Sequence, residues 1–331
     1  MERDTFPYKV LPDEDVVNRF ENLSRYQFEF AFPLNGYRIY NLAGFYPRDL
    51  VYLPDGCGVI IRNFDTDYED MNLISCKWMD RHRVRAKRKD QGITPWEYWC
   101  RNRVLVRQKS MEFYRSTDPF YLRETVYKLT HEATAFRPSL AVGFVKMFGC
   151  KRVLDFSAGW GDRLIGCLAA NVNMYCGVDP NGSLHPEYVD IAKFFGGATQ
   201  TVFVASPFET AEIPVPAKGF DLVFTSPPYF DLECYSSSET QSTHNRTLSQ
   251  WLEQFMYVSL SKAWGMMCKG GYLILVLNDQ PKDGHKYCVQ VVKYMKALPG
   301  AEYMGVISYS EFDSRDNPIS PQPCWIVRKV T

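Results

Sequence analysis

Short runs of hydrophobic residues alternate with amphipathic stretches through the second half of the chain. Seven runs are rich in Val, Leu, Ile and aromatic residues without strict polar alternation, which is typical of strands buried on both faces of a parallel sheet; they cover residues 151–156, 174–179, 201–205, 220–225, 272–278, 303–309 and 324–330. The stretches between them predict helices over residues 162–170, 186–195, 248–267 and 286–298. This alternation predicts a doubly wound α/β fold, a seven-stranded and mostly parallel sheet with helices on both faces. The two closely spaced last strands predict that the sheet ends in an antiparallel hairpin.

The first half carries a different pattern. Residues 1–125 are rich in Tyr, Phe and Arg, have few long apolar runs, and contain no repeat or Gly/Ser linker. Residues 126–148 predict a mainly helical stretch that leads into the first strand, with Pro138 tolerated near a helix start. We therefore expect an N-terminal α+β extension over residues 1–125 and a second domain over residues 126–331.

Composition limits the class of protein. The 331 residues are 46% hydrophobic and 23% charged, and 38 basic residues balance 38 acidic ones, which excludes a disordered chain and a polycation. The ten cysteines form no C-x-x-C pair and the histidines show no ligand spacing, so we expect free thiols, a reducing compartment and no metal site. The charged start and the lack of a 20-residue apolar run predict no membrane span. We expect a soluble, intracellular protein of the cytoplasm or nucleus.

A turn of small residues follows the first predicted strand, in the segment Asp155-Phe156-Ser157-Ala158-Gly159-Trp160-Gly161. Small residues let the backbone turn sharply and approach a ligand closely, with a helix N-terminus behind it. Asp155 precedes the turn, and Asp179 closes the second strand, where a carboxylate is suited to ribose hydroxyls. Two carboxylates in these places favour S-adenosylmethionine over a dinucleotide. A plain strand-to-helix turn, with Asp179 as a turn residue, is the alternative.

The fourth predicted strand runs into Ser226-Pro227-Pro228-Tyr229-Phe230. Two prolines at a strand end remove backbone donors and leave carbonyl oxygens free to accept. The carboxyl edge of an open α/β sheet is where such folds bind ligands. A simple proline turn is the alternative.

These two segments carry a family resemblance. DFSAGWGDRL, residues 155–164, resembles the S-adenosylmethionine motif of class I methyltransferases, and residues 150–331 resemble their whole Rossmann-like fold. SPPY resembles the (D/N/S)-P-P-(Y/F/W) signature of the amino-methyltransferases that act on exocyclic amines of bases. The resemblance implies catalytic roles for four residues, Ser226, Pro227, Pro228 and Tyr229. It implies cofactor contacts for eight residues, Asp155, Ser157, Ala158, Gly159, Gly161, Asp179, Ser206 and Arg137.

Three of these assignments depart from the family pattern or have rivals. Many members carry an acidic residue where this chain has Ser206, so Glu209 is an alternative contact for the adenine. Arg137, in a Phe-Arg-Pro motif, is expected to meet the methionine carboxylate, and a structural salt bridge is its alternative. Serine at position 226 is frequent in cytosine-specific enzymes but is shared by adenine enzymes.

The resemblance implies methyl transfer from S-adenosyl-L-methionine to cytosine N4 or adenine N6 in DNA, by direct in-line displacement. The same chemistry on RNA, at adenine N6 or guanine N2, is the first alternative. A non-catalytic, nucleic-acid-binding partner of a methyltransferase and an enzyme acting on a small amine or a protein amide are further alternatives. The polar stretch 234–249 predicts either a loop that closes over substrate or an ordinary surface loop. Neither the target sequence nor the oligomeric state follows from the sequence.

Residues 77–109 form a basic segment within this neutral chain. Eleven Lys or Arg face three Asp or Glu, a net charge of +8, with Trp78, Trp96, Tyr98 and Trp99 interleaved. Basic residues bind phosphates and aromatic rings stack on unpaired bases, so the segment predicts a nucleic-acid surface. The predicted contacts are Arg81, Arg83, Arg85, Lys87 and Arg88. A solvated face whose Trp residues belong to the core is the alternative.

Overall fold

The computed structural model of the chain describes residues 5–27, 30–31, 39–41, 57–62, 70–88, 92–130, 132–230, 232–235, 241, 247–279, 286–310 and 322–331. Lys89 of the basic segment and most of the predicted loop 234–249 lie outside these residues.

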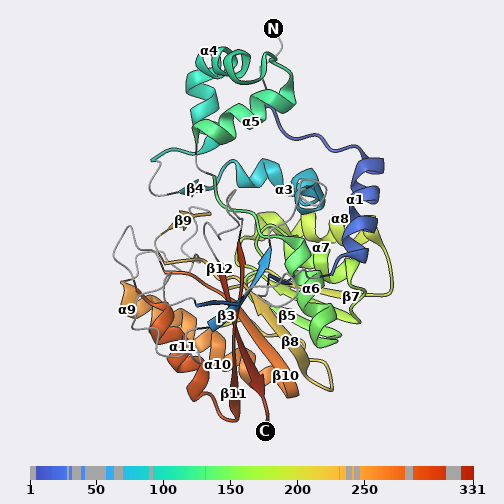
Figure 1. Ribbon diagram of the computed structural model, residues 1–331, viewed down its shortest axis with the longest axis vertical. Helices are drawn as coiled ribbons and strands as arrows, with labels where there is room; N and C mark the ends of the chain where they lie inside the picture. Colours follow the sequence, from blue (N-terminus) through green and yellow to red (C-terminus); the bar gives the residue numbers. More distant parts are fainter. Residues whose placement is uncertain are drawn as a thin grey trace.

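One large sheet forms the centre of the molecule (Figure 1). The second half of the chain contributes seven of its strands: β5 (Arg152–Asp155), β6 (Met174–Val178), β7 (Gln200–Val204), β8 (Phe220–Thr225), β10 (Met267–Val276), β11 (Ala301–Ser310) and β12 (Gln322–Lys329). Their order is β7-β6-β5-β8-β10-β12-β11. The first five are parallel, and β12 is antiparallel to both of its neighbours. The predicted seven mostly parallel strands are confirmed, and β11 and β12 form an antiparallel pair. The prediction that the sheet ends at this pair is wrong, because β3 (Cys57–Arg62) pairs with β11 and extends the sheet.

Three short strands from the first half extend this sheet. They are β1 (Phe30–Ala31), β2 (Ile39–Asn41) and β3 (Cys57–Arg62). β3 pairs in parallel with β11, and β1 and β2 pair with β3 in antiparallel fashion. Residue 125 lies inside helix α5 (Pro119–Leu129). The division of the chain into two domains at that point stays a prediction.

Helices cover both faces of the sheet, as expected. One face carries α1 (Asp13–Arg25), α6 (Pro138–Phe148), α7 (Asp162–Ala169) and α8 (His185–Phe195). The other carries α9 (Leu248–Trp251), the π-helical turn η6 (Leu252–Met256), α10 (Tyr257–Met266) and α11 (Cys288–Ala297). Because successive side chains of a strand point to opposite faces, Tyr175 lies in the first core and Cys176 in the second. Two apolar cores explain the runs without polar alternation.

The stretch 126–148 is less helical than its composition predicts. The end of α5 and all of α6 are helical, but residues 130 and 132–137 between them are not. Pro138 is the first residue of α6, and Arg137 before it is extended, with φ −101° and ψ 110°. A residue that precedes proline is disfavoured in the helical region, so the helix begins at the proline.

A helical hairpin stands at the top of the molecule in Figure 1, formed by α4 (Pro95–Tyr114) and α5. α4 begins at a capping box in which Thr94 and Glu97 each accept a backbone N–H from the other. A third, smaller core lies under the hairpin and contains Phe6, Val84, Trp99, Val106, Leu122 and Val126. α3 (Cys76–Arg83) and β4 (Lys87–Arg88) precede the hairpin and connect it to the rest of the chain. The remaining described elements are the short turns η3 (Asp70–Leu73) and η5 (Gly182–Leu184) and the strand β9 (Glu233–Cys234).

Candidate active site

The turn after β5 has the backbone that its glycines predict. Gly159 and Gly161 have φ of +55° and +73°, in the left-handed region that favours glycine. A Cβ at Gly161 would also lie 3.2 Å from the Cδ1 of Ile191 on α8. The N–H of Ala158 donates to the carbonyl of Val178 at 3.0 Å, which fixes the turn against β6. The two glycines therefore let the chain turn tightly between β5 and α7.

Asp155 lies beneath this turn and is fully buried, at 0% exposed. Its carboxylate accepts from the backbone N–H of Ser157 at 3.2 Å, from Nε of Arg163 at 2.8 Å and from the hydroxyl of Tyr175 at 2.9 Å. Arg163 also donates to the carbonyl of Ser157. Asp155 thus shapes the turn from inside, through partners that belong to the chain itself. The sequence contained one signal of this pair, because Arg163 is the single basic residue of helix α7, whose residues after it are all apolar.

Asp179 holds the turn from the other side. One carboxylate oxygen accepts the backbone N–H of Gly159 at 2.9 Å, and the other accepts that of Asn181 at 2.9 Å. Burial raises the pKa of Asp179, and the two N–H bonds oppose that rise. A carboxylate has about four acceptor positions, so Asp179 keeps lone pairs for hydroxyl groups of a ligand. The Tyr188 hydroxyl, which the sequence reasoning missed, donates to the carbonyl of Gly159.

The segment after β7 lies at the same edge of the sheet and is held from the opposite side. Ser206 is half-buried at its start. The Lys262 ammonium, on α10, donates to the carbonyl of Phe208 at 2.6 Å and to that of Ala211. Burial lowers the pKa of Lys262. The ring of Phe208 stacks on Phe156 with centroids 5.0 Å apart. Lys262 therefore positions the segment that carries Ser206.

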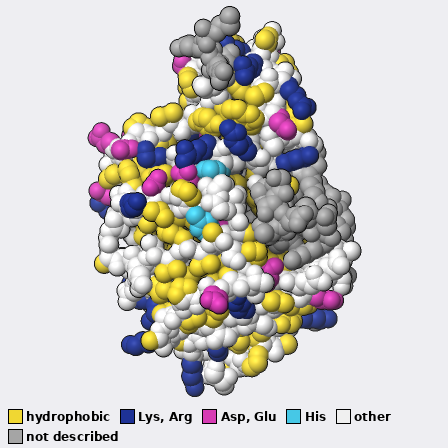
Figure 2. Space-filling model, turned by 180° about the vertical axis from the view of Figure 1, so that it is seen from behind, with side chains coloured by type: hydrophobic (Ala, Val, Ile, Leu, Met, Phe, Trp, Pro, Cys, Tyr) yellow, Lys and Arg dark blue, Asp and Glu magenta, His cyan; other side chains and the backbone are white. Residues whose placement is uncertain are grey.

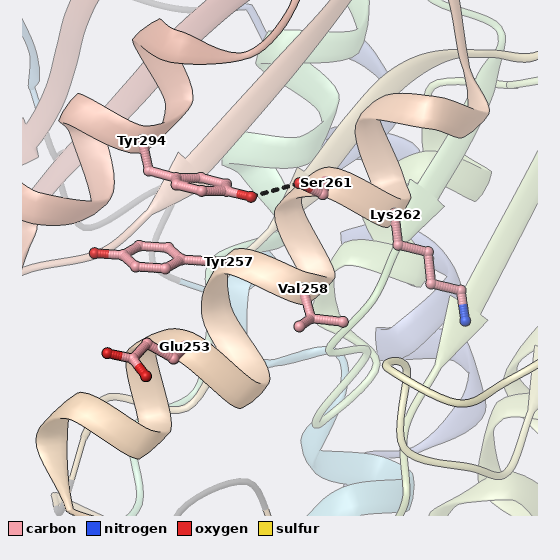
Figure 3. A pocket seen from close by; sticks show the side chains of 6 residues that line it. All are labelled: Glu253, Tyr257, Val258, Ser261, Lys262 and Tyr294. Atoms are coloured by element: carbon pink, nitrogen blue, oxygen red, sulfur yellow. Dashed lines mark hydrogen bonds between the residues drawn. The ribbon is translucent and has the colours of Figure 1, made fainter.

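Lys262 also borders a shallow groove on the outer helices (Figure 3). The other residues that line the groove are Glu253, Tyr257, Val258, Ser261 and Tyr294. The rings of Tyr257 and Tyr294 stack with centroids 4.2 Å apart, and Ser261 shares a hydrogen bond of 2.5 Å with the Tyr294 hydroxyl. The ammonium of Lys262 points out of the groove, away from Tyr294 (Figure 3). The polar groups of Ser261, Tyr294 and Lys262 thus bond to other groups of the chain.

Asp162, the first residue of α7, connects the predicted Phe-Arg-Pro motif to the turn. Its carboxylate accepts the backbone N–H of Phe136 at 3.1 Å, and the adjacent Arg137 is half-buried at the start of α6. Burial raises the pKa of Asp162 to about 7, although Ser75 and the charges of Arg83 and Arg163 oppose the rise.

This pKa predicts a measurable pH dependence of stability. A carboxyl with a pKa near 7 in the folded chain and near 4 in the unfolded chain binds its proton more tightly when folded. Its stabilising contribution is complete below about pH 4 and is lost as the pH rises to about 7, by about 1.4 kcal/mol per pH unit. We expect Asp162→Asn to lack this slope, so that the free energy of unfolding in urea of the wild type, relative to that of the variant, falls by about 1.4 kcal/mol per pH unit between pH 4 and pH 7. A difference that stays constant from pH 4 to 7 would show that Asp162 is ionised throughout.

The proline motif leaves the sheet beside the turn. β5 and β8 are adjacent and parallel, and Leu154 pairs with Val223, so the segments after Asp155 and after Thr225 emerge at one edge. The structure brings the predicted cofactor turn and residues 226–229 together there. Pro227 is buried, and Ser226, Pro228 and Tyr229 are half-buried.

The chain after the motif turns back toward the helical hairpin. β9 pairs with β4, so that Glu233 lies opposite Arg88 and Cys234 opposite Lys87. Thr134 and Tyr235 both donate to the buried carboxylate of Glu233. The distances are 3.0 Å from the Thr134 backbone N–H and 2.5 Å from the Tyr235 hydroxyl.

The Tyr235 ring then packs edge-on against Trp160 of the cofactor turn, with centroids 5.9 Å apart. Burial and the Glu233 carboxylate raise the pKa of the Tyr235 phenol well above its ordinary value. The basic segment, the proline motif and the cofactor turn are thus joined through Glu233 and Tyr235. Nothing in the sequence pattern indicates this pairing, because β4 and β9 are two residues long and far apart in the chain.

The basic segment divides into buried and exposed parts. Arg83 lies against Asp80 at 3.2 Å and Glu132 at 3.7 Å, in a buried cluster where Arg123 bonds both carboxylates. The charge of Arg83 therefore stabilises the contact between α3 and α5 and is not available at the surface. The pKa of Asp80 falls below its ordinary value although burial raises it, because Arg123 and Arg83 surround the carboxylate.

The other predicted contacts lie nearer to solvent. Arg81 pairs with Glu187 of α8. Arg85 is exposed and stands over the ring of Trp96 at 4.2 Å. Lys87 and Arg88 are half-buried in β4.

Two of the tryptophans proposed to stack on bases belong to cores instead. Trp78 and Trp99 are 8% and 1% exposed.

Among the described residues, none of the helices is long and apolar enough to cross a membrane. The described part of the chain also holds no cluster of His, Cys, Asp and Glu suited to a metal ion.

Comparison with known proteins gives similarity to solved structures alone. No protein-family model matches the chain, and no curated protein matches its sequence. The chain is similar to TrmN from Thermus thermophilus, at 16% identity and a TM-score of 0.39, over 59% of this chain and 49% of that one. It is also similar to a putative rRNA methylase from Clostridium thermocellum (15%, TM-score 0.41, 58% and 96%) and to an rRNA methylase from Streptococcus thermophilus (13%, TM-score 0.41, 60% and 100%).

The chain thus spans about half the length of TrmN. The strand order β7-β6-β5-β8-β10-β12-β11, with β12 reversed, identifies the fold independently of these alignments. The chain has a Rossmann-like, doubly wound α/β fold.

Proposed function

We propose that this protein transfers a methyl group from S-adenosyl-L-methionine to an exocyclic amine of a nucleobase, cytosine N4 or adenine N6, in a nucleic acid. One observation supports this above all others: Ser226-Pro227-Pro228-Tyr229 leaves β8 directly beside the turn after β5. β6 lies on one side of β5 and β8 on the other, so the strand order reverses between them. Ligands of open α/β sheets bind at such a switch point.

The residues at the turn fit the cofactor that this proposal implies. Two left-handed glycines bring bare backbone to the sheet edge, and Asp179 has lone pairs left for ribose hydroxyls. Ser206 lies on the neighbouring segment, where the adenine is expected. Asp155 acts from beneath the turn as a positioning residue. S-adenosylmethionine supplies an electrophilic methyl group on a sulfonium when it is bound.

The residues of the motif suit the acceptor amine. The nitrogen lone pair of a base amine is delocalised into the ring, which makes the amine a poor nucleophile. The Ser226 hydroxyl and the Pro227 carbonyl can each accept one amine hydrogen, which orients the nitrogen and stabilises the positive charge that develops on it. Tyr229 would stack on the base. The amine proton leaves after transfer, and no covalent enzyme intermediate is needed.

A base inside a duplex cannot reach such a site, so it must be flipped out or already unpaired. β4 places Lys87 and Arg88 beside β9, four to five residues after Tyr229. Cations there are well placed to bind the phosphates next to the target base.

DNA is the first polymer to test and RNA the second. The purified protein is incubated with methyl-labelled S-adenosylmethionine and with duplex DNA, single-stranded DNA, total RNA or a protein extract. We expect label in a nucleic acid. Label in protein would indicate that the motif methylates an amide or amine group of a protein. Bound cofactor without any labelled polymer would support the alternative of a non-catalytic partner subunit.

The role of the cations in and beside β4 gives a separate prediction. Arg85→Gln, Lys87→Gln and Arg88→Gln together should weaken nucleic-acid binding and lower the salt slope of log Kd by up to about 2.7, roughly 0.9 per lost phosphate contact on duplex DNA. The matched control is Lys151→Gln, Lys218→Gln and Lys269→Gln, since these exposed lysines lie near the amino ends of β5, β8 and β10. Fluorescence anisotropy at several salt concentrations measures both. Equal salt slopes of log Kd in the two triple variants would show that β4 does not contact the nucleic acid.

A further inference from the structure

The helical hairpin α4–α5 exposes several large apolar side chains to solvent. Its exposed apolar residues are Val104, Leu105, Met111, Phe113, Phe120 and Tyr127. Phe120 and Tyr127 are seven residues apart and lie on one side of α5, and we call this pair the hairpin face. Val104 is 71% exposed, Phe120 57% and Tyr127 59%. Among the residues whose exposure the structure describes, Phe113, Phe120 and Tyr127 are the only exposed aromatic side chains. Figure 2 shows hydrophobic side chains gathered near the top of the molecule, with Lys and Arg beside them.

This exposure follows from how the hairpin is built. α4 changes direction at Asn102, which has φ −126° and ψ 26°. Beyond that point only Val106 and Ser110 of α4 are buried. The two helices are also held together at the tip by Tyr114 and Tyr121, whose ring centroids are 5.1 Å apart. The hairpin is therefore closed without the hairpin face, which is left for a partner.

The charges around the hairpin face favour an anion. Arg101, Arg107, Arg115 and Lys128 are exposed on the same two helices and the turn between them. The Lys128 ammonium lies 5.2 Å from the ring of Phe113 and 4.6 Å from that of Tyr114. The exposed Glu112 is paired with Lys109 at 2.7 Å. Aromatic rings beside cations are the combination that binds unpaired nucleotides, since rings stack on bases and cations meet phosphates.

We propose that the hairpin face is a stacking platform for an unpaired stretch of the nucleic-acid substrate. The inference rests on the proposed function and deepens it by specifying a substrate that is single-stranded next to the target base. α4 begins seven residues after β4, which is hydrogen-bonded to the chain that follows the proline motif. A strand whose target base enters at Tyr229 would pass the cations of β4 and then reach the hairpin.

The test measures binding of the full chain to a fluorescent single-stranded oligonucleotide and to a blunt duplex of the same sequence. Phe120→Ala with Tyr127→Ala should weaken single-strand binding about tenfold or more, because stacking contributes roughly 1–3 kcal/mol per base. Duplex binding and the salt slope should stay nearly unchanged, since no cation is removed. Phe120→Trp with Tyr127→Phe should keep the wild-type affinity. The matched control is Val215→Ala with Met304→Ala, which trims exposed apolar residues elsewhere.

Several results would overturn the inference. They are unchanged single-strand binding in the Phe120→Ala, Tyr127→Ala variant, an equal loss on both polymers, or a wild type that prefers the duplex. If the wild type methylates a nucleic acid while the variant binds it normally, the platform fails and the proposed function stands. If the wild type neither binds nor methylates any nucleic acid, the proposed function fails first. The hairpin face would then be assigned to a protein partner.

Discussion

Ser226→Ala is expected to lower the rate of methyl transfer by about a hundredfold while the affinity for S-adenosylmethionine stays the same. The hydroxyl is assigned to the amine that attacks, so its loss removes an interaction that strengthens as charge develops on the nitrogen. Single-turnover kinetics with labelled cofactor measure the rate, and titration calorimetry measures the affinity. Ser261→Ala is the matched control, because Ser261 lies on the outer groove between α10 and α11.

The contrast between rate and affinity decides the role of Ser226. A parallel loss of both in Ser226→Ala would make the residue a structural part of the turn after β8. A rate within about twofold of wild type would show that the Pro227 carbonyl alone accepts a hydrogen bond from the amine during transfer.

Asp155→Asn should abolish measurable cofactor binding and lower the free energy of unfolding by about 3 kcal/mol. The substitution keeps the shape of the side chain but leaves the guanidinium of Arg163 without the carboxylate that it contacts at 2.8 Å. Arg163 is 4% exposed, and removing one partner of a buried ion pair costs roughly 3–5 kcal/mol. Urea unfolding gives the stability, and calorimetry at a temperature where the variant is folded gives the affinity.

A second variant separates stability from the shape of the turn. Asp155→Asn with Arg163→Met removes both charges and should recover much of the lost stability. We expect it still to bind the cofactor poorly, because the Arg163 bond to the Ser157 carbonyl is lost as well. Full cofactor affinity in either variant would contradict the positioning role of Asp155.

The sheet was predictable from sequence because its strands are buried on both faces. Val153 and Leu154 are neighbours in β5 that enter different cores, so apolar residues cover both faces of this strand. The glycines of the turn were predictable for a related reason, since positive φ at positions 159 and 161 limits the choice of residue.

Burial of individual charged and aromatic side chains was not predictable in the same way. Arg83 and Arg85 are two residues apart in one basic run, yet Arg83 joins the buried Asp80–Arg123–Glu132 cluster and Arg85 is exposed. Glu132, which lies 49 positions after Arg83 in the chain, and Arg123, which lies 43 positions after Asp80, decide this, and residue spacing carries no record of them. For the same reason the sequence pattern does not show which aromatic residues of α4 and α5, such as Phe120, are exposed to solvent.

The most direct test of the account is the chemical identity of the methylated product. After reaction with isotope-labelled S-adenosylmethionine, the nucleic acid is digested to nucleosides and analysed by mass spectrometry, with Ser226→Ala as the parallel sample. The account predicts label in N4-methylcytosine or N6-methyladenine from the wild type and little from the variant. Label on a ring carbon, a ribose oxygen or a phosphate oxygen would contradict transfer to an exocyclic amine at the Ser226-Pro227-Pro228-Tyr229 motif.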